Sequence, residues 1–216
     1  DIDSLEVEVY GAPANASAAL YGWSIESDGT WTYLYAQCHR QFGYDPFFGV
    51  PAHDRSCTSR VKVGRVPRGE LFEAQQFWTG RGWSLDATRA VPIINRRDVV
   101  ASPTQFVRKN NRWMAITKLD DWWGEQIIVE QAIHPGGPYE VVAEYRSEKK
   151  CPDCNTYFSS WIDGQNDDSP DAPMIGSLSH NRWDGAPSAI YRPTFFVVAP
   201  QRHDEESQIT FVHQFS

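Results

Sequence analysis

Carboxylate side chains are the groups of this chain that could supply acid and base chemistry. Two of them stand out, Asp54 in the segment His53-Asp54-Arg55 and Asp163 in the segment Trp161-Ile162-Asp163. Two carboxyl groups that flank a glycosidic bond can protonate the leaving oxygen and act as base or nucleophile. Both residues also have a structural alternative, because Asp54 could pair with Arg55 and Asp163 could be a turn residue before Gly164.

Aromatic and planar polar side chains could bind a sugar. An aromatic face packs against the C–H face of a sugar ring, and planar polar groups bridge neighbouring hydroxyls. The chain has 9 Trp, 9 Tyr and 11 Phe, a bias that both strands and sugar sites favour. The expected substrate-binding residues are Trp23, Ser102, Trp122, Trp123, His180, Asn181, Tyr191 and Arg192. Further candidate platforms are Trp83, Trp161 and Trp183, and packing in the core is the alternative for every tryptophan.

The four cysteines allow three pairings, and their spacing favours two structural disulfides, Cys38 with Cys57 and Cys151 with Cys154. A zinc site is the rival, but the chain has only one C-x-x-C and no second pair to complete it. A redox C-x-x-C is another alternative, although no βαβ pattern surrounds it. Disulfides persist in oxidising compartments, so we expect a secreted, extracellular protein.

Charge and hydropathy argue against two classes of partner. The chain has 20 basic and 28 acidic residues and a net charge of −8, whereas nucleic-acid binding needs a basic surface. No run of about 18 apolar residues is present for a membrane span. We therefore expect no nucleic acid and no membrane as a partner, and the aromatic bias favours a carbohydrate. The chain starts at Asp1 and lacks the regions of a signal peptide, which suggests a mature or processed form.

No familiar cofactor or hydrolase motif is present. The sequence lacks a P-loop, G-x-G-x-x-G, H-E-x-x-H and G-x-S-x-G, which argues against nucleotide binding and the common metalloprotease and serine-hydrolase sites. We expect no cofactor. Calcium is the alternative, at the acidic stretch Asp163, Asp167, Asp168 and Asp171, but a solvated acidic turn explains it as well because the spacing of an EF-hand is missing.

Hydrophobic patterning predicts an all-β chain. Residues 31–36 are aromatic and β-branched and follow a Ser27-Asp28-Gly29 turn after residues 21–25, which predicts a hairpin. Residues 70–77 could form a couple of helical turns at most. Further along the chain a turn at 109–111 separates similar strands, which predicts a four-stranded antiparallel meander. Its expected strands are residues 102–107, 112–116, 126–133 and 139–145.

Internal similarity predicts a repeated sheet. Residues 59–66, with the turn Pro67-Arg68-Gly69, parallel residues 127–133, with the turn His134-Pro135-Gly136-Gly137. The period of about 67 to 80 residues is typical of repeat architectures, and four-stranded sheets at this interval are typical of a β-propeller. We expect a β-propeller of four-stranded antiparallel blades, as a single domain over residues 1–216 or the C-terminal part of one. A β-sandwich with two similar hairpins is the alternative.

Several short segments, in their order along the chain, resemble the five-bladed β-propeller glycoside hydrolases, most closely their endo-D-arabinanase-type branch. The resemblance covers about residues 19–200. The segments are Tyr21-Gly22-Trp23, Gly82-Trp83-Ser84-Leu85-Asp86, residues 132–139 (AIHPGGPY), Ser177-Leu178-Ser179-His180-Asn181 and Tyr191-Arg192-Pro193.

The resemblance implies a funnel at the propeller axis, where carboxylates flank a glycosidic bond. It implies a secreted glycoside hydrolase that acts on a polysaccharide such as an arabinan. Strand ends and loops over the funnel are the useful positions, and this criterion selects Asp54 and Asp163 as the catalytic candidates. The alternative function is a non-catalytic carbohydrate-binding or assembly propeller.

The sequence departs from the family pattern in two respects. Its 216 residues supply roughly three or four blades rather than five, so a missing N-terminal segment or a partner chain is expected to complete the propeller. Related hydrolases often carry an acid after a proline in an innermost strand. Here Thr104 follows Pro103 and Thr194 follows Pro193, which favours the binding alternative or acids at other positions.

Overall fold

The protein is built from antiparallel strands. The computed structural model describes residues 21–37, 60–95, 104–119, 124–147, 154–162, 173–182, 192–203 and 206–215. Among these residues the only helical element is a short 3-10 helix, η2 (Ala87–Arg89). The predicted all-β class is confirmed. The prediction of helical turns at residues 70–77 is wrong, because this stretch consists of turns that lead into a strand.

Sheet 1 has six strands, and two short strands share one edge of β3. Its strands are β1 (Tyr21–Ser27), β2 (Trp31–Gln37), β3 (Arg60–Pro67), β4 (Gln76–Trp78), β5 (Trp83–Ser84) and β6 (Ile94–Asn95). The order is β1-β2-β3-β4-β5, and β6 also pairs with β3. Because β4 pairs with Gly64 and Arg65 of β3, and β6 with Arg60 and Val61, both lie along the edge of β3 that β2 leaves free. The segment between them carries β5 and η2.

Sheet 2 is the predicted meander. Its strands are β7 (Gln105–Lys109), β8 (Arg112–Lys118), β9 (Gln126–Ala132) and β10 (Glu140–Arg146). They pair in the order β10-β9-β8-β7, which confirms the prediction. The turn from β7 to β8 has two central residues with positive φ, Asn110 at 52° and Asn111 at 58°. Asparagine tolerates this conformation better than most residues, and such two-residue turns match the twist of a hairpin.

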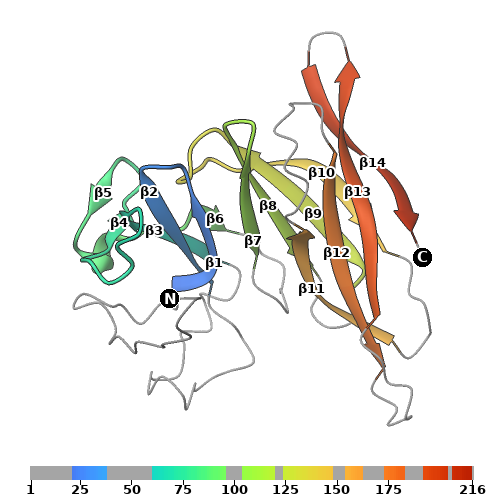
Figure 1. Ribbon diagram of the computed structural model, residues 1–216, viewed down its shortest axis with the longest axis horizontal. Coiled ribbons are helices and arrows are strands. Elements are labelled where there is room, and N and C mark those ends of the chain that lie inside the picture. Colours follow the sequence, from blue (N-terminus) through green and yellow to red (C-terminus); the bar gives the residue numbers. More distant parts are fainter. Residues whose placement is uncertain are drawn as a thin grey trace, which may run out of the picture.

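Sheet 3 is a second continuous meander. Its strands are β11 (Cys154–Ile162), β12 (Met174–Arg182), β13 (Arg192–His203) and β14 (Glu206–Phe215). They pair in chain order, β11-β12-β13-β14. Figure 1 shows the three sheets side by side, with sheet 2 between sheet 1 and sheet 3.

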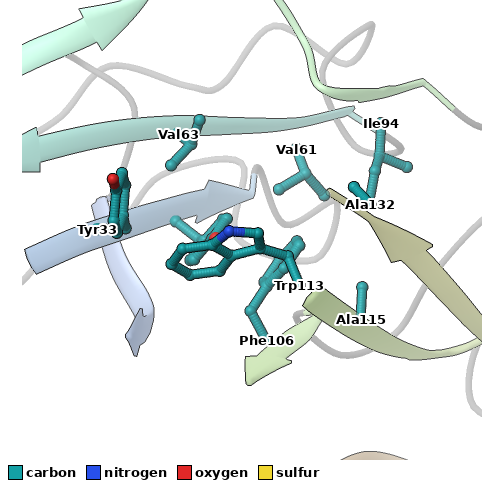
Figure 2. Packing of buried hydrophobic residues seen from close by; sticks show 9 residues of the cluster. Tyr33, Val61, Val63, Ile94, Phe106, Trp113, Ala115 and Ala132 are labelled. Carbon is teal, nitrogen blue, oxygen red and sulfur yellow. The ribbon is translucent and has the colours of Figure 1, made fainter. Parts of the chain in front are cut away.

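Sheet 2 is buried on both faces, which explains the unbroken apolar run in β8. Successive side chains of a strand point to opposite faces. Trp113 and Ala115 therefore pack with Tyr33, Tyr35 and other residues of sheet 1 in one cluster (Figure 2). Met114 and Ile116, on the other face, pack with residues of β12 and β13. Three stacked sheets differ from the alternative of a β-sandwich, which has two.

The first strands of the sheets lie next to one another. The Ser24 hydroxyl in β1 accepts from the Phe106 amide at 2.9 Å and donates to the Phe106 carbonyl at 3.4 Å, and Glu26 accepts from the Arg108 amide at 3.0 Å. Both pairs are 82 residues apart in sequence, so β1 and β7 run parallel. β7 lies in turn beside β11, and β10 beside β14. The Ser24 and Glu26 side chains thus hydrogen-bond to backbone groups at an edge of β7 that no backbone ladder covers.

We predict that Ser24→Ala lowers the free energy of unfolding by about 1–2 kcal/mol, because it removes the hydroxyl that satisfies the buried amide of Phe106. Urea denaturation followed by circular dichroism measures the loss. Thr30→Ala, at an exposed turn position, is the matched control and should change stability by less than about 0.5 kcal/mol. Equal losses in the two variants would contradict a role for the hydroxyl in joining the sheets.

The predicted internal repeat corresponds to equivalent positions of two sheets. β3 is the third strand of sheet 1, and β9 is the third strand of sheet 2, as the similarity of residues 59–66 and 127–133 requires. Closure of the sheets into a propeller stays a prediction.

Candidate functional site

The strand ends of the three sheets meet at two opposite ends. We call one of them the polar end. The strands that end there are β2, β8, β10 and β12. The strands that begin there are β3, β7, β9, β11 and β13. The other, the hairpin end, holds the β1–β2, β7–β8 and β9–β10 turns. Lys109 Nζ in the β7–β8 turn donates to the Pro173 carbonyl at 3.4 Å, which places the residue before β12 at the hairpin end as well.

Buried polar groups join sheets 1 and 2 at the polar end. The Gln37 Oε1 atom accepts from the Thr104 amide at 2.6 Å, and the Thr104 and Thr117 hydroxyl oxygens are 2.8 Å apart. Thr104 is 2% exposed and Thr194, on β13, is fully buried. The two threonines that stand where related hydrolases carry an acid are therefore interior residues of the sheets.

Sheets 2 and 3 are also joined there by polar groups. The Thr156 hydroxyl at the start of β11 donates to the Gly124 carbonyl, just before β9. Lys118, at the end of β8, is fully buried, and its Nζ donates to the Leu119 carbonyl at 3.4 Å. Lysine is almost never fully buried unless it is paired, and buried charges cluster at functional sites. The polar end thus carries a buried lysine beside the hydrogen bonds that join the sheets.

Sequence reasoning missed Lys118 and a second buried charge, Glu130 of β9, which is 5% exposed. The signal that could have found them is a charged residue inside an apolar run. Lys118 stands between Thr117 and Leu119 in β8, and Glu130 follows Val129 in β9. Burial of a charge is costly unless hydrogen bonds or an opposite charge compensate it. A charged residue in an otherwise apolar strand is therefore a candidate for a functional role.

Most of the predicted site residues follow or precede strand ends of the polar end. Asn181 lies near the end of β12, where it pairs with Asn155 of β11, and Arg192 begins β13, where it pairs with His180. His180 itself is 2% exposed, so its side chain belongs to the interior beneath this end. The residues that lie outside the described ranges are Asp54, Ser102, Trp122, Trp123, Tyr191 and Asp163.

The strands before and after the undescribed residues show at which end of the sheets each connection begins or ends. Asp54 lies between β2 and β3, Ser102 before β7, and Tyr191 before β13, and Trp122-Trp123 lie between β8 and β9. All these strand ends are at the polar end. Asp163 is the exception, because it follows Ile162, the last residue of β11, at the hairpin end.

Trp23 is the described tryptophan of the predicted set. It lies near the start of β1, where the pairing with β2 shifts register between Tyr21 and Ser24. Its side chain is 38% exposed, and its carbonyl accepts from Gln105 Nε2 at 3.4 Å. The register shift turns the strand locally and leaves an aromatic face open near the polar end. Its role in binding stays a prediction.

Cys154 begins β11, is 7% exposed and is disulfide-bonded. Cys38, Cys57 and Cys151 lie outside the described residues, so the pairing Cys38–Cys57 and Cys151–Cys154 stays a prediction. The described ranges hold no group of three or more His, Cys, Asp or Glu residues that could bind a metal ion. The acidic stretch with Asp167, Asp168 and Asp171 falls outside them. None of the helices in the described part is long and apolar enough to cross a membrane.

A comparison with protein families adds a classification to this geometry. The family described as "Domain of unknown function (DUF5005)" matches residues 5–160. The chain belongs to the DUF5005 family. The matched part of this DUF5005 protein runs through sheets 1 and 2 and ends inside β11, so the family domain includes most of the polar end. No curated protein sequence matches the chain.

Three solved structures of the exo-beta-1,3-galactanase from Phanerochaete chrysosporium are similar to the DUF5005 chain. One contains galactose and two contain beta-1,3-galactotriose. Their sequences are 11–12% identical, and their TM-scores are 0.43–0.44. The alignments cover 85% of this chain and 44% of the galactanase chains, so the chain spans less than half their length.

Proposed function

We propose that this DUF5005 protein is a secreted carbohydrate-active β-propeller unit, with a glycoside hydrolase site at the polar end. The observation that carries the proposal is the meeting of strand ends there. The connections that hold Asp54, Ser102, the Trp122–Trp123 pair and Tyr191 are far apart in sequence, yet the strands that flank them all end on this one side.

The arrangement of the sheets supports the propeller part of the proposal. Each sheet starts with a strand that lies beside the first strand of the next, as β1 does with β7 and β7 with β11. Radial repetition of four-stranded sheets leaves short, protected edges. In this proposal sheets 1, 2 and 3 are three successive blades, and the first strands line the axis.

The proposed chemistry is acid–base hydrolysis by two carboxylates. Asp54 supplies one of them, in the β2–β3 connection. Asp163, the other candidate, directly follows Ile162, where β11 ends at the hairpin end. We therefore propose Asp120 or Asp121, which follow β8 in the chain and precede the Trp122–Trp123 pair, as the second carboxylate. Carboxyl groups about 5–10 Å apart would suit either stereochemical outcome. An arabinan is the proposed substrate, on the sequence resemblance.

The disulfide-bonded state of Cys154 supports the secreted part of the proposal, because disulfides persist in oxidising compartments. The second candidate function is a non-catalytic carbohydrate-binding protein. It is favoured by one observation, the burial of Thr104 and Thr194 at positions where related hydrolases carry acids. Both candidates share a carbohydrate ligand and differ only in bond cleavage.

One assay separates the two candidates. The full chain is incubated with arabinan and with β-1,3-galactan, whose oligosaccharides are the ligands of the similar galactanase, and new reducing ends and retained protein are measured in parallel. Release of oligosaccharides supports the hydrolase. Binding to either polysaccharide without release over many hours supports the binding protein, and the absence of both overturns the proposed function.

A further inference from the structure

Six side chains at the hairpin end form a cluster that the proposed function does not use. We call it the aromatic–arginine cluster, and its members are Trp31, Tyr33, Arg65, Trp78, Trp83 and His134. The Arg65 guanidinium carbon lies 3.8 Å from the centroid of the Trp31 ring and 4.3 Å from that of Trp83. A cation over the faces of two indoles is attracted by both rings. Arg65 therefore holds the two indoles at a fixed separation.

Sheet pairing positions these residues. Tyr33 of β2 pairs with Arg65 of β3, and Arg65 pairs in turn with Gln76 of β4. Trp78 of β4 pairs with Trp83 of β5, and their ring centroids are 5.2 Å apart. The short strand β5 creates this geometry. The chain turns back after β4, pairs with it as β5 and so brings Trp83 over Arg65.

Planar polar groups line the cluster and are held in fixed orientations. Arg65 Nε donates to Gln76 Oε1 at 2.9 Å, and the Tyr33 hydroxyl donates to Asp28 Oδ2 at 2.7 Å. Burial raises the pKa of Asp28, but hydrogen bonds from Tyr33 and from the amides of Trp31 and Thr30 outweigh burial and lower this pKa overall. Asp28 is therefore a carboxylate at neutral pH. This carboxylate, next to the cluster, offsets the charge of the Arg65 guanidinium.

His134 adds a donor from sheet 2. It lies in the β9–β10 connection, with its ring centroid 4.7 Å from that of Trp78. Its Nδ1 accepts from the Gly136 amide at 2.9 Å, so a neutral ring carries its proton on Nε2. Burial and, to a smaller extent, the nearby Arg65 lower the pKa of His134, which keeps the ring neutral at pH 7. His134 is an exposed residue, and Nε2 is the ring atom left to donate.

The partly exposed rings of the cluster lie on buried aromatic side chains. Trp31, Trp78 and Trp83 are half-buried, whereas Tyr33 beneath them is 4% exposed and packs edge-on against the buried Trp113 at 4.8 Å. Preformed aromatic surfaces lose little conformational entropy when a ligand binds.

We propose that the aromatic–arginine cluster is a second carbohydrate-binding site, which takes a neutral saccharide. The exposed parts of the half-buried indoles that Arg65 does not cover suit the C–H faces of sugar rings, and the Arg65, Gln76, Asp28 and His134 groups can bridge hydroxyls. The balanced charge of the cluster favours a neutral ligand over a uronate or a sulfated one. The site lies at the end of the sheets opposite the polar end, so a long polymer could occupy both sites and gain affinity from the second. This inference does not require that the polar end cleaves any bond.

Titration of the ¹⁵N-labelled full chain tests the proposal. The probes are arabinohexaose and β-1,3-galactotriose, which are neutral, and trigalacturonate, which is acidic. The indole N–H signals of Trp31, Trp78 and Trp83 are assigned by single tryptophan-to-phenylalanine substitutions. We expect a neutral probe to shift these signals. Shifts confined to other tryptophans, a response to trigalacturonate alone, or no response to any probe would overturn the proposal.

Two variants give the affinity arm of the test. Trp83→Ala should weaken binding of the neutral probe to the cluster at least tenfold. Arg65→Met should do the same, because it removes the guanidinium donors and the cation that holds the Trp31 and Trp83 indoles. Phe72→Ala, an exposed aromatic residue at 52% of full exposure in the β3–β4 connection, is the matched control and should bind as the wild type does. Equal affinity in all three variants contradicts the site. Hydrolysis measured on the same variants separates a failure of this proposal from a failure of the polar-end proposal.

Discussion

Trp113→Ala is expected to lower the free energy of unfolding by about 3–5 kcal/mol, the cost of truncating a buried tryptophan to alanine. Trp113 is 2% exposed and lies between sheets 1 and 2 (Figure 2). Its ring centroid is 4.8 Å from that of Tyr33 and 6.4 Å from that of Tyr35. The cavity would open in the middle of the interface, where two sheets cannot collapse onto a single missing ring. Because domains of this size are stable by only about 5–15 kcal/mol, the variant should be marginal.

Urea denaturation followed by far-ultraviolet circular dichroism measures this effect. Trp23→Ala is the matched control, since it removes the same side chain from a position that is 38% exposed, and it should cost far less. Trp113→Phe keeps an aromatic ring in the site and should fall between the two. A loss for Trp113→Ala no larger than that for Trp23→Ala would show that the interface of the two sheets does not hold the fold together.

Local pattern was enough to predict the strands of sheet 2. The alternation and turn chemistry of residues 105–146 act over a few positions, and the Asn110-Asn111 turn fixes the register of its hairpin. The same local signals predicted the β1–β2 hairpin. They failed at residues 70–77, because β4 is a strand of three residues, too short for a period to show. The strand depends on its pairing with β3. This pairing is a tertiary contact, which a local sequence pattern does not encode.

The site could be predicted only as a set of residue types. Trp23, Asn181 and Arg192 were selected by chemistry, but which strand ends meet depends on how the sheets stack, and no periodicity encodes stacking. The same limit explains His180, a polar residue in an S-L-S-H-N segment that gives no sign of its burial to 2%. It also explains why Arg65 was not among the predicted site residues. Its neighbours Trp31 and Trp83 lie 34 positions before it and 18 positions after it in the chain.

The described strands that flank the two catalytic candidates end on opposite sides of the sheets, and this difference gives the second prediction. Asp54 lies in the connection from β2 to β3, whose flanking residues Gln37 and Arg60 are at the polar end. Asp163 follows Ile162, and β11 runs from the polar end to the hairpin end over nine residues. At about 3.3 Å per residue, a strand of that length separates its two ends by more than any pair of cooperating carboxylates allows.

Asp54→Asn should therefore lower the rate of polysaccharide hydrolysis by about 10²- to 10⁴-fold, the usual contribution of a general acid or base, whereas Asp163→Asn should leave the rate within a few-fold of the wild type. The substitutions are matched, since each replaces one carboxylate by an isosteric amide. Reducing ends released from arabinan measure both rates, and circular dichroism shows that both variants fold. The reverse result, an active Asp54→Asn and an inactive Asp163→Asn, would move the catalytic site to the hairpin end, because amide and carboxylate differ in charge and in proton transfer but scarcely in size.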